Sequence, residues 1–390
     1  MRRMFLIILI LAAGHPAGWA AGSLQPMPPV AGVEFSVPEG ERRAVLLPLQ
    51  DRVGDSHLAL ETAAAFRQAL SAVAFLKDPA VVRDAMRRLR ARNVRDISPA
   101  QLETLFAELQ AEWLFAPTLH EASEGLVPTV ILSAQVFRAG EEDVTWAGFR
   151  STSGLERRRV LGRGIEVDLE PVLQRAVNDL VQDYAREALI RGAAGCRLTR
   201  KAHAPGFRRE SLDPAQLGRV AVIPFDASTG ARGAVNAEML TALAMAELYR
   251  HGVRVALPTM VSETLRRRRN MIPGELGPEA RLALFNTHDV DQIFTGMIEV
   301  FDSQGGIEPK PAVEFGARLL AAENGKILWM DGLFEDGWTR KRLFLTRRTF
   351  AGGRLAESMM HAIVTGALIP VDNPTPQAAP PLAQAKGSRP

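Results

Sequence analysis

The chain has 390 residues, of which 47% are hydrophobic and 23% are charged, and its formal net charge is +3. This length is enough for two domains of ordinary size with cores that need no covalent staples. Only six of the 47 basic residues are lysines, an arginine bias that is typical of a GC-rich genome rather than of a nucleic-acid-binding surface. Because Cys196 is the single cysteine, the chain cannot form an internal disulfide. Cys196 is then either a small buried side chain or a site of intermolecular cross-linking.

The N-terminus has the three parts of a secretory signal peptide. Met1–Met4 is short and basic, Phe5–Ala13 is apolar, and Ala20 and Ala21 are small residues at a suitable cleavage position. The apolar run is shorter than the ~20 residues of a membrane span, so an uncleaved anchor is the alternative and cleavage is favoured. We therefore expect residues 1–21 to be removed and the mature protein to be periplasmic. Since no cysteine follows the run and no later stretch is long and apolar enough, neither lipid attachment nor a membrane span is expected after cleavage.

An extended leader at 22–41 is expected to precede a first α/β domain at 42–190. Apolar residues at spacings of three and four predict a helix around Leu60–Val73, and Ser98-Pro99 has the N-cap and first-turn proline of another helix. The expected elements are a strand at 42–49, helices from Leu60 to Val73, at 81–92 and at 99–111, strands at 113–120, 129–138 and 143–152, and a closing helix at 171–189.

The strand at 129–138 alternates in character. One set of side chains is Val130, Leu132, Ala134 and Val136, and the other is Thr129, Ile131, Ser133, Gln135 and Phe137. The first set is much more apolar than the second. This period of two predicts a strand of an antiparallel meander with one dry and one wetter face.

A linker is expected at 191–216, because the segment contains Gly and Pro and lacks periodicity. A second domain at 217–369 follows, and the Pro/Ala-rich segment 370–390 is expected to be a disordered tail. The elements expected in the second domain are strands at 219–225 and 252–257, helices at 235–249, 261–269 and 278–285, strands at 291–301, 312–321 and 326–334, and a helix at 353–368.

The two domains are copies of one another. Arg43–Leu49 recurs as Arg219–Phe225 at an offset of 176, and Trp146 recurs as Trp329 at an offset of 183. Other matched segments have offsets of 179 and 182. Offsets this long and this similar indicate a domain duplication with small loop differences rather than a solenoid. The predicted fold class is therefore α/β, with two tandem mixed sheets on which helices pack.

Three segments of the second copy carry a family resemblance. They are Val220–Phe225 (VAVIPF), Asp291–Gly296 (DQIFTG) and Ala321–Trp329 (AAENGKILW). Together they resemble the CsgG/LpoB-like domains of the curli-secretion and penicillin-binding-protein-activator lipoproteins. The amino-terminal domain of TolB and the tandem flagellar H-ring proteins have a similar architecture. The family's last motif usually has an aspartate where this chain has Ala321-Ala322-Glu323, and the lipoprotein cysteine is absent here.

The resemblance implies fold residues and no catalytic ones. We expect a structural role for five residues that end strands, make a turn or fill the core: Pro48, Trp146, Pro224, Gly325 and Trp329. No cofactor, metal ligand or catalytic residue is implied by the matched segments.

Four short motifs have an ordinary structural interpretation that outweighs a chemical one. His288–Asp291 offers too few ligands in sequence for a zinc site, and His120-Glu121 lacks the second histidine of a zincin motif. Gly230–Gly233 lies where phosphate-binding loops occur but lacks the Gly-Lys-Ser/Thr that follows in such loops. Ser151–Gly154 is the end of an expected strand and has no Gly-x-Ser-x-Gly pattern.

The four arginines Arg266, Arg267, Arg268 and Arg269 form the densest charge cluster. We name them the arginine cluster. Its ordinary role is a solvated helix end, where cations interact favourably with the negative end of the helix dipole. Its functional role is a candidate interaction patch for an acidic partner or an anionic envelope surface.

These observations predict a non-enzymatic periplasmic protein that docks partners or acts as a scaffold in cell-envelope assembly. The partners are expected to be envelope proteins and not nucleic acids. One alternative is a component of a curli-type secretion apparatus, although such a pore needs longer amphipathic hairpins than this chain offers. A second alternative is a periplasmic hydrolase of an unrecognised type.

Overall fold

The computed structural model describes residues 43–124, 127–156, 165–190, 206–208, 217–227, 230–268, 276–303, 310–337 and 351–368. Five sequence expectations lie outside these residues: the signal peptide 1–21, the leader 22–41, Cys196, Arg269 and the tail 370–390. None of the described helices has the length and apolar character that crossing a membrane requires.

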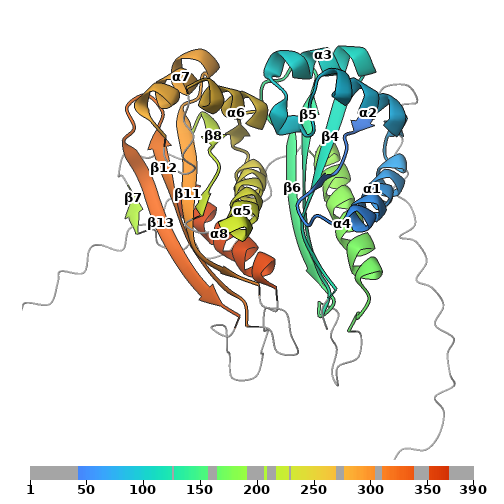
Figure 1. Cartoon of the computed structure of the whole chain (residues 1–390). Helices are drawn as coiled ribbons and strands as arrows, with labels where there is room; N and C mark the ends of the chain where they lie inside the picture. The colour runs from blue at the N-terminus through green and yellow to red at the C-terminus, as the bar shows by residue number, and fades with distance from the viewer. Residues whose placement is uncertain are drawn as a thin grey trace, which may run out of the picture. The chain divides into compact units, whose positions relative to one another are not determined.

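The first repeat is a six-stranded mixed sheet with helices on it (Figure 1). Its elements are β1 (Arg43–Leu46), β2 (Gln50–Asp51), α1 (Ser56–Ser71), β3 (Phe75–Leu76), α2 (Pro79–Arg88), the 3-10 turn η1 (Val94–Asp96), α3 (Pro99–Leu109), β4 (Trp113–Ser123), β5 (Thr129–Arg138), β6 (Trp146–Ser153) and α4 (Leu169–Ile190). The strand order is β3-β1-β4-β5-β6, with β2 pairing β4. Strands β4 to β6 form the expected antiparallel meander, and β1 lies parallel to β3 and β4.

Local sequence signals explain where the helices of this repeat begin. The Asp55 carboxylate caps α1 by accepting hydrogen bonds from the backbone N–H groups of His57 and Leu58. Helix α3 begins with a reciprocal capping box between Ser98 and Gln101, with Pro99 in the first turn. The N-cap predicted at Ser98-Pro99 is confirmed.

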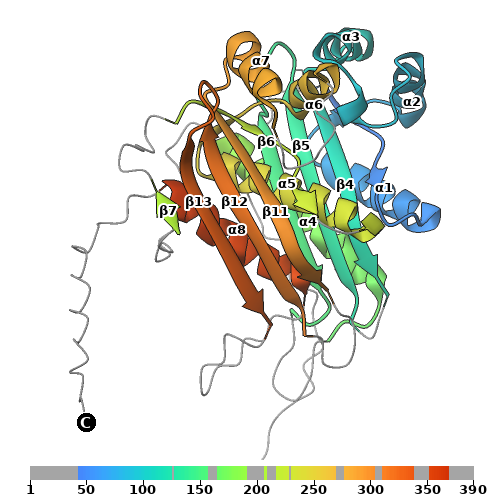
Figure 2. The same ribbon diagram turned by 60° about the vertical axis from the view of Figure 1, so that its left-hand side comes forward.

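The second repeat is a seven-stranded sheet of the same design. Its elements are β7 (Phe207–Arg208), β8 (Arg219–Val222), β9 (Asp226–Ala227), α5 (Gly230–Arg250), β10 (Arg254–Val255), α6 (Pro258–Arg267), α7 (Pro278–His288), β11 (Gln292–Asp302), β12 (Ala312–Ala321), β13 (Ile327–Asp336) and α8 (Gly352–Leu368). The strand order is β10-β8-β11-β12-β13-β7, with β9 pairing β11. Strand β7 lies within the segment predicted as a linker and pairs with β13 at the edge of the sheet (Figure 2).

Strand pairing confirms the duplication residue by residue. Ala44 is paired with Trp113 in the first sheet, and Val220 is paired with Gln292 in the second; these pairs have the sequence offsets 176 and 179. Both meanders also have a β-bulge at the same place, between Leu119 and Glu121 in β4 and between Ile298 and Val300 in β11. A bulge is a specific local feature, so its repetition at an offset of 179 fixes the structural equivalence of the two copies. The α/β fold class with two tandem mixed sheets is confirmed.

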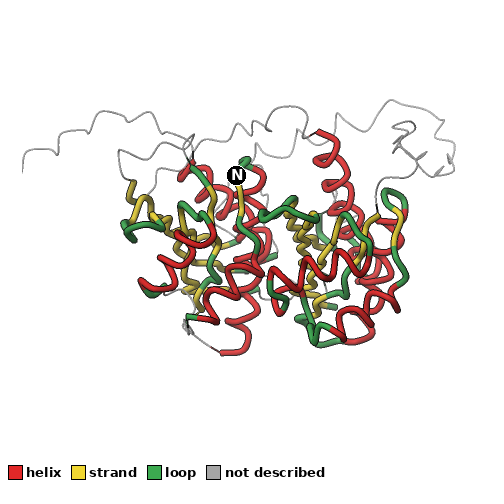
Figure 3. The backbone as a smooth tube through the Cα atoms, turned by 90° about the horizontal axis from the view of Figure 1, so that it is seen from above, coloured by secondary structure: helices red, strands yellow, loops and turns green. Residues whose placement is uncertain are grey.

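Each repeat buries a tryptophan that stacks on a phenylalanine between its sheet and helices. Trp146 stacks on Phe115 with 6.1 Å between ring centroids, and Trp329 stacks on Phe294 with 6.4 Å. In the first repeat, helices α1 and α4 lie against one face of the sheet; in the second, α5 and α8 do so (Figures 1 and 3). Buried apolar residues of both repeats belong to one continuous hydrophobic core. That 42–190 and 217–369 fold as separate domains stays a prediction.

Candidate functional site

The first sheet is buried on both faces. The side chains of β5 and β6 that point away from α4 include Ile131, Ser133, Gln135, Phe149 and Ser151, and these five are buried. We call these residues the covered face. The alternation in 129–138 had predicted that this set would be wetter, and that expectation is wrong because the second repeat lies on it.

Helices α5 and α8 of the second repeat cover this face. Gln135 Nε2 donates a hydrogen bond to Met245 Sδ of α5 over 3.6 Å. At Gly353 in α8, a Cβ atom would lie 2.6 Å from both Ile131 Cδ1 and Ser151 Oγ. Real Cβ atoms do not approach other atoms so closely, so the helix backbone sits directly on the sheet and only glycine fits there.

Ion pairs surround this contact between the repeats. Arg52 Nε lies 2.6 Å from Glu238 of α5, and Arg354 of α8 lies 2.8 Å from Glu156. All four groups are partly exposed, so each pair contributes little to stability, but together they fix the orientation of the helices.

A second contact between the repeats involves Arg219 and the β5–β6 hairpin. The Arg219 guanidinium is 3% exposed and lies 2.5 Å from Asp143 and 3.1 Å from Glu142. The backbone N–H of Val144 donates to the carbonyl of Val255 in β10 over 2.8 Å. The repeats are therefore joined by buried charge and by backbone pairing as well as by apolar packing.

The equivalent face of the second sheet is exposed. It carries Met297 and Met330, each 46% exposed, and Phe334, which is 55% exposed. Val300 and the β7 residue Phe207 are also exposed. We call these five residues the open face.

The strand register places the open-face residues on one side of the sheet. Met330 lies directly opposite Phe207, and Val300 and Phe334 both lie opposite Glu314. No described helix lies on this side of β11 to β13 (Figure 2). Exposed apolar side chains of this size on one side of a sheet make that side the candidate interaction surface among the described residues.

The arginine cluster is solvated at the end of α6. Arg266, Arg267 and Arg268 are exposed, and Arg267 forms an ion pair with Glu263 one turn before it. The cluster has a counterpart in the first repeat, where Arg87 and Arg88 end α2 at the offset of 179.

The residues predicted to be structural lie at the following places. Trp146 and Trp329 are buried, Pro48 and Pro224 are half-buried just after β1 and β8, and Gly325 has a φ of +74° in the β12–β13 hairpin. These positions are consistent with fold roles, and none of the five belongs to the open face.

Two of the motifs weighed in the sequence make structural hydrogen bonds. The carbonyl of His288 accepts a hydrogen bond from Arg219 Nη1 over 2.7 Å, and the Asp291 carboxylate accepts one from the Arg219 backbone N–H over 2.8 Å. His120 shares a hydrogen bond of 2.8 Å with Ser133 on the buried side of the first sheet. These contacts give His288–Asp291 and His120 structural roles.

One buried cluster was missed in the sequence. Glu247 lies in the last turn of α5, His251 follows directly after this helix, and His361 joins them from α8; one ligand atom of each lies within 4.8 Å of the others. The spacing of four residues between Glu247 and His251 was the signal available. The side chains are of a kind that holds a divalent cation. However, one Glu247 oxygen accepts from Arg250 and the other lies 3.1 Å from His361 Nδ1. Its negative charge is thus already balanced, and the arrangement favours a buried ion-pair network.

The network shifts two pKa values. Burial raises the pKa of Glu247, but the hydrogen bond from His361 and the charge of Arg250 outweigh it, so the net pKa is lowered. Burial lowers the pKa of His251, against the opposing attraction of Glu247. Glu247 is therefore ionised and His251 neutral near pH 7.

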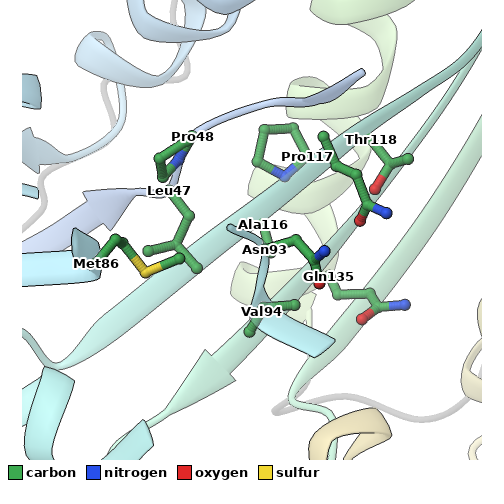
Figure 4. A pocket seen from close by; sticks show the side chains of 10 residues that line it. Leu47, Pro48, Met86, Asn93, Val94, Ala116, Pro117, Thr118 and Gln135 are labelled. Carbon is green, nitrogen blue, oxygen red and sulfur yellow. The ribbon is translucent and has the colours of Figure 1, made fainter. Parts of the chain in front are cut away.

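A small hollow beside β1 and β4 has no catalytic character (Figure 4). Its ten described lining residues are Leu47, Pro48, Gln50, Met86, Asn93, Val94, Ala116, Pro117, Thr118 and Gln135. None of these ten is acidic, basic, a histidine or a cysteine. A nucleophile with a neighbouring base is therefore not available among them.

Neither models of known protein families nor curated protein sequences give a match to this chain. Solved structures similar to part of it include the PelC dodecamer from Paraburkholderia phytofirmans, with 17% identity, a TM-score of 0.29, and coverage of 42% of this chain and 96% of that one. Lipoprotein GNA1162 from Neisseria meningitidis has 18% identity and a TM-score of 0.28, over 37% of this chain and 99% of that one. The C-terminal domain of LpoB from Salmonella enterica has 12% identity and a TM-score of 0.21, over 34% of this chain and 87% of that one. These likenesses concern the fold of part of the chain, and they assign none of the activities of those proteins to it.

Proposed function

We propose that this chain is a non-enzymatic protein of the cell envelope that acts by docking other proteins through the open face of its second sheet. The observation that carries the proposal is the exposure of Met297, Met330 and Phe334 on one side of β11 to β13. Removing apolar side chains of this size from water is favourable, so their exposure leaves free energy available for binding a partner.

The first repeat supports this proposal because its equivalent face has a partner. There α5 and α8 bury the whole covered face, so this side of the fold is a surface on which helices dock. The same side in the second repeat has the strand order and bulge of the first, and large apolar side chains that are exposed.

The described polar clusters support a non-enzymatic role. Glu247 is held by Arg250 and His361, and His120 shares its hydrogen bond with Ser133, both inside the packed interior. A catalytic centre needs such groups at a surface that substrate can reach. Placement in the envelope rests on the signal-peptide pattern of residues 1–21 and on the family resemblance.

The test is capture of envelope proteins by the exported chain. Wild type, Met330→Asp and Phe334→Asp proteins are immobilised and exposed to a solubilised envelope fraction. We expect specific capture by wild type and its loss in both variants. Leu282→Asp is the matched control, because Leu282 is an exposed apolar residue on α7, outside the open face. Equal capture by all four proteins would contradict docking through the open face.

N-terminal sequencing of the chain in the envelope fraction tests export. An intact Met1 in the cytoplasm would contradict it.

A further inference from the structure

We propose that the partner on the open face is a second copy of this chain, whose α1 and α4 cover it in the way that α5 and α8 cover the first sheet. The inference rests on the proposed function and names the partner of the same surface. It predicts head-to-tail association of identical chains.

The contact between the two repeats joins two different surfaces. One is a sheet face of the first repeat, and the other is the helix pair α5 and α8 of the second. Because the repeats have the same fold, each surface occurs twice in the chain, and one copy of each is used. The two unused copies are the open face and the outer surface of α1 and α4. A contact between unlike surfaces can therefore be repeated from chain to chain, and it gives a ring if the rotation closes or a filament if it does not.

Burial follows this pattern helix by helix. In α5, every residue from Met239 to Tyr249 is buried, whereas α1 exposes Leu60 at 69%. Nearly all of α8 is buried as well, whereas α4 exposes Gln182 and Arg186. The helix pair of the second repeat is covered on both sides, and the pair of the first repeat has one side available.

The available side of α1 suits a flat partner. Leu60, Ala64 and Gln68 are exposed at successive spacings of four, so they line one face of the helix. The row contains a single apolar anchor, Leu60, and the short side chain of Ala64 lets the helix backbone approach a surface closely. Gly353 gives α8 the same close approach to the first sheet.

The open face has a shape that receives such a helix. Gly316 and Gly332 are paired directly across β12 and β13, and Met297 lies opposite Gly316. Two adjacent glycines leave the sheet surface low at its centre. Met330 and Phe334, on either side of Gly332 along β13, rise above it as apolar walls.

Several features of the contact within the chain are not repeated between chains. Pro171 of α4 stands at the position of Gly353, and Ala59 of α1 stands at the position of Glu238. Arg219 pairs with Asp143, but the residues at the equivalent positions are Arg43, which is exposed, and Lys326, which is exposed on the β12–β13 hairpin. Two cations would meet there. Association between chains is therefore expected to be weaker than the contact within the chain and to be reversible.

Sedimentation velocity of the exported chain tests the proposal directly. We expect the average mass to rise with concentration up to about 100 µM, since ordinary interfaces of this type bind in the micromolar range or tighter. Phe334→Asp and Leu60→Asp should each abolish the rise, although the two residues are on opposite surfaces. Leu282→Asp should associate as wild type does. All three residues are exposed, so circular dichroism should show unchanged folding.

Mixing the two defective variants gives the sharpest outcome. The Phe334→Asp chain keeps an intact α1, and the Leu60→Asp chain keeps an intact open face. A head-to-tail contact predicts that the mixture forms one-to-one heterodimers that grow no further. A mixture that stays monomeric, although wild type associates, would overturn the head-to-tail arrangement.

The substitution Lys326→Asp is expected to increase the affinity between chains. It restores an acidic partner for Arg43 of the next chain, so we expect association to tighten about tenfold, as a charge-assisted hydrogen bond worth about 1.4 kcal/mol would give. The double variant Arg43→Ser with Lys326→Asp should lose this gain. A Lys326→Asp chain no tighter than wild type would contradict the repetition of the contact between repeats.

The failures of the two proposals are distinguishable. If wild type is monomeric throughout but Phe334→Asp loses a captured envelope protein, the second copy is the wrong occupant and the docking function stands. If wild type neither associates nor captures a partner, both proposals fail.

Discussion

The meanders of the two repeats have the same register and the same bulge, but only the first is buried on both faces. Its covered face carries Ser133 and Gln135, which make hydrogen bonds, beside the apolar Ile131 and Phe149. The equivalent positions of Ser133 and Gln135 in the second repeat, Gly316 and Arg318, lie among exposed methionine and phenylalanine. Large apolar side chains are thus exposed on the surface that has no partner among the described residues. This difference teaches that the burial of a sheet face is decided by what packs on it rather than by its own hydropathy.

The largest expected effect concerns the aromatic pair that the repeats share. Trp329→Ala and Trp146→Ala should each lower the free energy of unfolding by ~3–5 kcal/mol, because each removes a large buried ring that stacks on phenylalanine. Urea unfolding followed by circular dichroism measures both. A loss below about 1 kcal/mol for one of the two would show that the copies do not use this position alike.

A smaller effect on stability is expected from substitutions in α8, which packs on the covered face, and none from the equivalent position in α4. Gly353→Leu puts a side chain where a Cβ already lies 2.6 Å from Ile131 and Ser151, so it should destabilise the protein by ~1–3 kcal/mol through overpacking. Pro171 is the equivalent position in α4, at the offset of 182, and it is exposed. Thermal unfolding of Gly353→Leu should therefore show a lower Tm, and Pro171→Leu should not. Equal shifts in the two variants would mean that α8 does not rest on the first sheet.

Acid should weaken the second repeat through His251. Burial lowers its pKa in the folded protein, so below the unfolded value of about 6.5 the unfolded chain takes up a proton that the folded chain does not. Stability is thus full above this pH and falls as the pH drops toward the folded pKa. Glu247, whose folded pKa is lowered, adds a loss only at more acidic pH, below about 4.3.

The measurement is the free energy of unfolding between pH 7.5 and pH 5.5. His251→Gln should flatten its decline relative to wild type. The counterparts of His251 and His361 in the first repeat are Ala72 and Asp179, so this acid response belongs to one copy alone. A slope that does not depend on His251 would contradict this origin.

Much of the fold could be predicted from the sequence because its signals are local. The Ser98-Pro99 cap, the meander strands and the two-copy offsets depend on residues close in the chain or on direct repetition. The burial of Gln135 depends on Met245, which is 110 residues away, and no local pattern contains it. For the same reason the Glu247–His251–His361 cluster appeared only when α5 and α8 were placed together. The open face could not be predicted either, because the sequences of β12 and β13 are those of ordinary meander strands and do not show which face the helices cover.

The smallest expected effect concerns the arginine cluster, for which the first repeat supplies an internal control. Arg87 and Arg88 at the end of α2 are the counterparts of Arg266 and Arg267, and each helix end has a local ion pair, Asp84 with Arg87 and Glu263 with Arg267. These exposed charges contribute little to folding, so replacing Arg266, Arg267, Arg268 and Arg269 together by serine should change the free energy of unfolding by less than about 1 kcal/mol.

If the cluster steers a partner, the effect appears in the association rate. Exposed charges are screened beyond about 8–10 Å at physiological ionic strength, so the fourfold variant should bind more slowly than wild type at low salt and equally at high salt. Surface plasmon resonance with the captured partner, or with a second copy of the chain, measures both rates at two salt concentrations. The Arg87→Ser, Arg88→Ser double variant is the control, because it removes charge from the same helix end of the other repeat. A slower rate in the fourfold variant alone would give the cluster a docking role. Equal rates in all three proteins would leave it as a solvated helix end, which is the role that the matching ion pairs of the two repeats favour.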